Sequence, residues 1–148
     1  MTASVQVTKE PENPEPYLLL NRQRKYRVDR PDCLKFLTIL VEHLHPQGTF
    51  SVVLVSDRVM RSYNSRYRGL DEPTDVLSFP CDGAYMGDVL VSTETAYKQV
   101  RHSRKLTFES NLKRLMLHGL LHLMGYDHEI DGGEMRILER RIRRRLRC

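Results

Sequence analysis

The chain has 148 residues, of which 40% are hydrophobic, and a net charge of +5. This length lets one domain bury a core without disulfide staples, so we expect a single domain over residues 1–148. No apolar run is as long as a membrane span or the centre of a signal peptide, so we expect a cytoplasmic protein and neither a membrane-spanning nor a secreted one.

The first predicted elements are a strand, a helix and a second strand. Residues 17–20 are apolar and follow a proline-rich start, which indicates a short strand. Asp32 is the candidate N-cap of a helix whose apolar residues keep helical spacing as far as Leu44, and residues 45–48 end it. Residues 50–55 are rich in β-branched side chains and predict a second short strand.

A helix, a turn and a strand follow in the middle of the chain. Asp57 is the candidate N-cap of a helix that closes near Gly69. Residues 71–74 predict a turn. Residues 75–79 predict a strand that Pro80 halts, because proline cannot donate a hydrogen bond to a neighbouring strand.

The remaining elements complete a mixed α and β pattern. Residues 88–91 predict a strand after a loop that contains Gly83 and Gly87, and Thr93 is the candidate N-cap of a short helix. Residues 108–124 form a longer helix that is apolar on nearly every side, which is typical of a central, buried helix. We therefore expect the α/β (α+β) class, with a single mixed sheet and helices packed over it.

Arginines crowd the C-terminal end, between Arg136 and Arg147, and a second basic cluster lies between Arg22 and Arg30. Both clusters favour a polyanionic partner such as nucleic acid. At the C-terminal end, a solvated helix face explains the arginines as well as a nucleic-acid contact does. The reason is that apolar residues from Met135 onward mark the opposite face of the same predicted helix.

Three histidines form the most informative pattern in the sequence. His118 and His122 share one face of the central helix, and His128 follows after Gly125, which can end the helix in a left-handed conformation. Asp127 fits this turn better than it fits an outer contact to a histidine. Three imidazoles leave one position open on a zinc ion, as in catalytic sites, so we predict one Zn²⁺ held by His118, His122 and His128. Nickel, copper and iron also suit such ligands.

Packing of the histidines in the core is the alternative to metal binding. One histidine on an apolar helix is usually satisfied by its neighbours, but two on one face beside a third need a common partner to offset their burial. Gly119 lies between the first two histidines, where glycine costs about 1 kcal/mol relative to alanine. Close packing of a strand against Gly119 explains this glycine better than a direct role in admitting substrate.

The same histidine spacing occurs in the metzincin metalloproteases. Those proteases need a glutamate directly after the first histidine as general base, and here that position is Gly119. Peptide hydrolysis by their mechanism is therefore disfavoured. A phosphodiester fits better, because zinc itself lowers the pKa of water and a nearby cation can stabilise the charge on phosphorus.

Residues 118–128 resemble the HGxLHLxGYDH signature of the YbeY endoribonucleases, a family of ribosomal RNA maturation factors. Residues 67–80 are similar to the YRGKDxPTDVLSFP stretch of that family, and residues 87–89 to its Gly-Asp-Ile strand start. The three blocks also have the order and separation of the family. The resemblance covers about residues 32–140, and nothing is carried over to the first thirty residues or to the arginine-rich end.

The resemblance implies a mixed α/β domain with zinc on the three histidines, and single-strand-specific cleavage of RNA during maturation of small-subunit ribosomal RNA. It also implies a role in ribosome quality control and contact with a small-subunit ribosomal protein. Arg68 matches an arginine that is functionally essential in the family, and its guanidinium suits a clamp on the scissile phosphate. Without the family, an exposed turn residue would be the more common role of such an arginine. Thr74 and Asp75 match as well, although turn formation explains them as well as catalysis does.

Three functions remain open from the sequence. The first is a zinc-dependent RNA hydrolase in which Arg68 neutralises charge and a basic surface holds the strand. The second is a zinc-stabilised assembly factor that binds ribosomal RNA without turnover. The third is a metalloprotease, which Gly119 disfavours. The sequence places no obvious general base beside the metal, so hydrolysis would rest on water at the metal or on the RNA's own 2′-hydroxyl.

Overall fold

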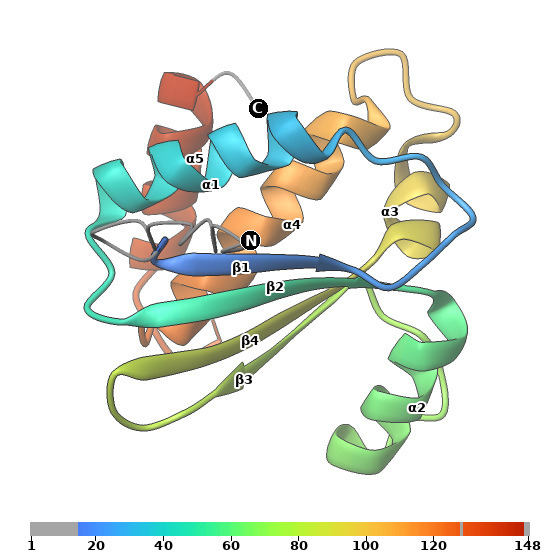
Figure 1. Ribbon diagram of the computed structural model, residues 1–148, viewed down its shortest axis with the longest axis horizontal. Helices are drawn as coiled ribbons and strands as arrows, with labels where there is room; N and C mark the ends of the chain where they lie inside the picture. The colour runs from blue at the N-terminus through green and yellow to red at the C-terminus, as the bar shows by residue number, and fades with distance from the viewer. Residues whose placement is uncertain (1–14, 128, 147–148) are drawn as a thin grey trace, which may run out of the picture.

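The computed structural model describes residues 15–127 and 129–146. Within these ranges four strands form one mixed sheet, which five helices surround (Figure 1). The elements are, in chain order, β1 (Tyr17–Asn21), α1 (Arg30–Leu44), β2 (Thr49–Val55), α2 (Asp57–Arg68), β3 (Val76–Pro80), β4 (Tyr85–Ser92), α3 (Thr93–Val100), α4 (Phe108–Leu123) and α5 (Glu134–Leu146). The predicted class, a single mixed sheet with helices over it, is confirmed. No helix in the described ranges is long and apolar enough to cross a membrane.

The sheet has the strand order β1-β2-β4-β3. Strands β1, β2 and β4 run parallel, and β3 is antiparallel to β4 and lies at an edge. The main core fills one face of this sheet, where α1, α4 and α5 pack, whereas α2 lies apart from them and covers a smaller apolar cluster on the other face (Figure 1). The edge strand β3 therefore contributes side chains to both layers.

Helix α4 is the central helix that its all-round apolar sequence predicts, and nine of its residues are buried. It approaches the sheet closely at Gly119, where an added Cβ would lie 2.2 Å from a methyl carbon of Val89 and 3.2 Å from one of Val76. The hydroxyl of Ser78 donates a hydrogen bond of 2.9 Å to the carbonyl of Gly119. Close packing against strands thus accounts for the glycine, as expected.

The C-terminal end of α4 is also as predicted. Gly125 has a φ of +96°, and its N–H donates to the carbonyl of His122. The N–H of Tyr126 donates to the carbonyl of Leu121. This pair of hydrogen bonds is a Schellman motif, which turns the chain away from the helix axis immediately after the second histidine.

The structure corrects the residue that caps each of three helices. In each of them the side chain of an earlier residue accepts a hydrogen bond from a backbone N–H three positions later, so the predicted cap lies inside the first turn. The observed caps are Asp29, Ser56 and Ser92, in place of Asp32, Asp57 and Thr93. In α1 the cause is Pro31, because its fixed φ suits the first turn and lets the helix begin before Asp32.

The hairpin of β3 and β4 is longer than predicted. Pro80 is the last residue of β3 instead of lying outside it, which an edge strand tolerates. Gly87 lies within β4 and not in a loop, with a φ of +133°. A Cβ on Gly87 would lie 2.1 Å from the carbonyl oxygen of Phe79, so the strand pairing itself requires glycine there.

Asp57 connects α2 to α3 instead of capping α2. Its carboxylate accepts hydrogen bonds from the Ser92 hydroxyl (2.6 Å), the Thr95 hydroxyl (2.5 Å) and the Lys98 ammonium (2.7 Å). Burial raises the pKa of Asp57, but the hydrogen bonds from Lys98, Ser92 and Thr95 outweigh it and hold this pKa below its ordinary value of 3.8.

Asp57 should therefore make the protein sensitive to acid. Since the folded-state pKa is the lower one, the unfolded chain binds the proton first, and the stability contributed by Asp57 is lost as pH falls below about 4. We expect the free energy of unfolding of the wild type to exceed that of Asp57→Asn at neutral pH and to approach it in acid. Denaturation of both proteins across this pH range measures the difference, and a gap that stays constant would contradict the assignment.

Gly119→Ala should lower the free energy of unfolding by about 1–3 kcal/mol, because the added methyl group overlaps a fully buried valine that cannot move away. Urea denaturation measures this loss. The matched test is the same change in a Val89→Ala background, where the overlapping methyl groups are gone and the cost should shrink or reverse. An equal cost in both backgrounds would show that the clash with Val89 is not the cause.

Candidate functional site

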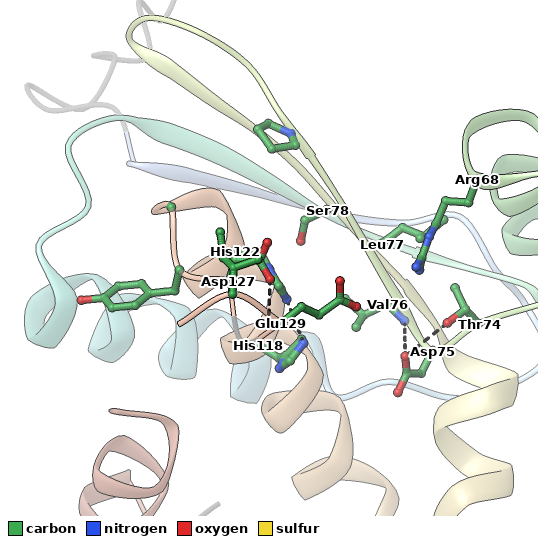
Figure 2. A pocket seen from close by; sticks show the side chains of 14 residues that line it. Arg68, Thr74, Asp75, Val76, Leu77, Ser78, His118, His122, Asp127 and Glu129 are labelled. Atoms are coloured by element: carbon green, nitrogen blue, oxygen red, sulfur yellow. Dashed lines mark hydrogen bonds between the residues drawn. The ribbon is translucent and has the colours of Figure 1, made fainter. Parts of the chain in front are cut away.

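A cleft of about 720 Å³ lies beside the edge strand β3, between α4 and the end of α2 (Figure 2). Its walls come from two segments that are distant in sequence, residues 68–80 and, in the described part of the chain, residues 118–127 with 129–130. These segments contain the two main motifs of the sequence analysis. The structure therefore brings Arg68, Thr74 and Asp75 to the same cleft as His118 and His122.

The two histidines lie one turn apart on α4, and their rings meet edge-on, with centroids 4.7 Å apart and planes at 70°. The Nε2 atoms of His118 and His122 are 3.1 Å apart. Two nitrogens bound to one tetrahedral zinc ion, each at about 2.0–2.1 Å, are separated by roughly 3.3 Å. The spacing of this pair is therefore suitable for two ligands of a single metal ion.

Glu139 on α5 holds the other side of the first histidine. Its Oε1 lies 2.5 Å from Nδ1 of His118. A carboxylate only accepts hydrogen bonds, so a neutral His118 donates from Nδ1 and keeps the lone pair of Nε2 directed toward His122. This arrangement of carboxylate and imidazole is common behind metal-binding histidines.

Glu139 was not among the site residues predicted from the sequence, although a signal for it exists. Glu139 lies four residues after Met135 and three before Ile142, and both of these are buried in the core. Helical spacing therefore places this carboxylate on the apolar face of α5. A charged residue on such a face needs a partner, and His118 is one.

The third predicted ligand, His128, lies outside the described residues. Within residues 15–127 and 129–146, no group of three or more His, Cys, Asp and Glu side chains is arranged to hold a metal ion. The zinc site consequently stays a prediction. The structure describes two of its proposed ligands, His118 and His122, and the contact of Glu139 with His118.

Arg68 is the last residue of α2, and its exposed side chain extends toward β3 on the wall of the cleft (Figure 2). No carboxylate in the described part of the chain forms an ion pair with Arg68. Arg61, in the same helix, differs in this respect because its guanidinium pairs with Asp71 at 2.8 Å. Arg68 is thus available to an anion in the cleft.

Three carboxylates also line the cleft. Asp75 accepts a hydrogen bond from the Gln99 amide at 3.0 Å, and its other oxygen accepts the N–H of Val76 at 2.8 Å. Asp127 accepts the N–H of Glu129 at 2.9 Å, so it forms the turn, as predicted. Glu129 is exposed on the cleft wall and had no role in the sequence analysis. Its position in a turn after the helix gives no periodic signal that would have indicated it.

The chain is similar to proteins of known family. A family model described as endoribonuclease YbeY matches residues 19–147. The endoribonuclease YbeY of Solibacter usitatus is 37% identical over 134 residues, which cover 90% of each chain. That of Aquifex aeolicus is 40% identical over 118 residues, covering 76% of this chain and 77% of its own. A Thermotoga maritima protein with a known solution structure matches with a TM-score of 0.58 and 29% identity over 84% of both chains.

The matched range is wider than the resemblance in the sequence motifs indicates. Residues 32–140 contain all three motifs, but the family model begins at residue 19, within β1, and continues through α5 to residue 147. The expectation that the first thirty residues and the arginine-rich end lie outside the resemblance is therefore wrong for residues 19–30 and for the arginine-rich end, whereas residues 1–18 lie outside the match. Helix α5, which carries Glu139, lies within the matched range.

Proposed function

Because this chain belongs to the YbeY endoribonuclease family, we propose that it is a metal-dependent hydrolase that cleaves single-stranded RNA. The observation that carries the proposal is that one cleft is lined by Arg68, which has no carboxylate partner in the described chain, and by the converging imidazoles of His118 and His122. Cations beside an open groove suit a phosphodiester substrate.

We further propose, from family membership, that the substrate is ribosomal RNA of the small subunit and that the protein acts in the cytoplasm during its maturation and in ribosome quality control. A small-subunit ribosomal protein is the proposed protein partner. The arginines of α5 and the basic residues before α1 supply positive charge for contact with RNA, whose phosphates bind cations without regard to sequence.

Zinc is the cofactor that the side chains fit, with His118, His122 and His128 as the proposed ligands. The 3.1 Å separation of the first two Nε2 atoms and the carboxylate of Glu139 behind Nδ1 support this choice. When bound, zinc supplies Lewis-acid chemistry that activates water at neutral pH.

The role proposed for Arg68 follows from its charge and shape. A planar guanidinium binds two oxygens of a phosphate at once, which positions the phosphodiester in the cleft. Negative charge on these oxygens grows as phosphorus gains a further oxygen, so the same hydrogen bonds strengthen in the transition state. Asp75 belongs to the same wall segment as Arg68 and is held by Gln99, whose side-chain carbonyl in turn accepts a hydrogen bond from the buried Asn111.

The zinc site predicts a graded loss of metal in two variants. His118→Ala should abolish binding of the single zinc ion, and Glu139→Gln should weaken it by about 10–100-fold, because the imidazole loses its charged acceptor. Elemental analysis and competition with a chelator measure both effects. His102→Ala, which removes an exposed histidine beyond α3, is the control and should keep full metal. Full zinc content in His118→Ala would exclude the site.

Arg68→Ala should keep the fold and the zinc but cleave a defined single-stranded RNA about 10²–10³-fold more slowly. Arg68→Lys should recover only part of this loss, because lysine lacks the bidentate geometry. Arg58→Ala removes the same charge from the exposed start of α2, away from the cleft, and should retain most of the activity.

The same assay separates turnover from binding. The His118→Ala protein, purified in parallel, reveals any contaminating nuclease. Equal cleavage by wild type, Arg68→Ala and His118→Ala would reject the proposed hydrolase and favour an assembly factor that binds ribosomal RNA without cutting it.

A further inference from the structure

Three aromatic rings meet where the end of α2 lies over β3. Tyr63 and Tyr67 are one turn apart on α2, with ring centroids 6.0 Å apart and planes only 12° from parallel. Phe79 on β3 contacts Tyr67 edge-on, with centroids 5.1 Å apart. Tyr63 and Tyr67 are 38% and 59% exposed, whereas Phe79 is half-buried. The cluster thus has a half-buried base and an open aromatic surface.

Packing of α2 on the sheet does not require this open surface. Met60 in the same helix is fully buried against Leu77 and Leu90, and this small core already joins α2 to the sheet. Tyr67 adds a large ring whose greater part stays in water. An exposed aromatic surface of this kind is common where proteins bind ligands.

The aromatic cluster and the cleft are separated only by the edge strand. Along β3, Val76 and Ser78 lie toward α4, as their contacts with Gly119 show. Leu77 packs with the α2 side of the sheet, and Phe79 packs against the same cluster. Arg68 follows Tyr67 directly in the chain and lines the cleft. A phosphate held by Arg68 therefore places the adjoining nucleoside near the exposed face of Tyr67.

We propose that Tyr67, supported by Tyr63 and Phe79, is a stacking site for one unpaired base of the RNA strand, next to the phosphate that Arg68 binds. This inference rests on the proposed function, and it gives a physical reason why the protein would prefer single-stranded to double-stranded RNA. Every base has a face that stacks on an aromatic ring, but in a duplex these faces are already covered by neighbouring bases. The exposed Arg66 on the same helix adds positive charge for a flanking phosphate.

The test measures binding of a fluorescent single-stranded RNA by anisotropy, in the presence of chelator so that the strand stays intact. Tyr67→Ala should bind about ten- to a hundredfold more weakly than wild type, and Tyr67→Phe should bind within about twofold, because the ring and not the hydroxyl makes the contact. An oligonucleotide of the same length without bases should bind equally to all three proteins.

Tyr97→Ala is the matched control. Tyr97 is 39% exposed and stacks on Tyr26 at 4.8 Å in a separate aromatic cluster on α3, so its loss removes a similar ring that does not line the cleft. Binding of RNA by this variant should equal that of wild type. Tyr67→Leu preserves apolar packing on Phe79 and replaces Tyr67→Ala if the smaller side chain unfolds α2.

Two results would overturn the stacking site. One is unchanged binding of RNA by both Tyr67→Ala and Tyr67→Leu, and the other is an equal loss for RNA and for the strand without bases. The outcome is separate from that of the cleavage assay. If the wild type cleaves RNA but the Tyr67 variants bind RNA as well as it does, only the stacking site is rejected. If the wild type does not cleave RNA but the Tyr67 variants lose base-dependent binding, only the hydrolase is rejected.

Discussion

The close approach of α4 to the hairpin of β3 and β4 determines the form of the whole cleft. At Gly119 the helix backbone lies against Val89 and Val76, and the hydroxyl of Ser78 reaches its carbonyl. A larger residue would push α4 away from β3, and with it the histidines that flank the glycine. The absence of a side chain at Gly119 therefore sets the distance between the wall of the cleft that carries Arg68 and the wall that carries the imidazoles.

Sequence periodicity was sufficient to predict the helices and the strands, because burial imposes a period of about 3.6 or 2 on the chain. The two motifs that meet in the cleft came instead from the spacing of the histidines and from the family resemblance of residues 67–80. Periodicity was insufficient for the caps, since Ser56 beside Asp57 and Ser92 beside Thr93 are equally good candidates by type. The actual cap depends on which side chain the neighbouring helix requires. The carboxylate of Asp57 accepts a hydrogen bond from Lys98 on α3, and the hydroxyl of Ser56 caps α2 instead.

The contacts that the sequence did not reveal each join two different elements of the fold. Glu139 meets His118 across two helices, and Tyr67 meets Phe79 across a helix and a strand. No local pattern encodes such a meeting, because it depends on how the layers pack. Glu139 was nevertheless detectable in part, as a charge on the buried face of α5, whereas Tyr67 looks like an ordinary residue of a polar helix.

The contact of Glu139 with His118 also couples two equilibria, the docking of α5 and the binding of a ligand at His118. If docking of α5 orients the imidazole for a ligand, then a ligand on that imidazole must favour the docked helix by the same free energy. The arginines on the outer face of α5 thereby gain a second means of influence. If a polyanion binds these arginines more tightly when α5 is docked, it favours the same docked state as a ligand on His118, and the outer surface and the cleft are then coupled without any shared ligand.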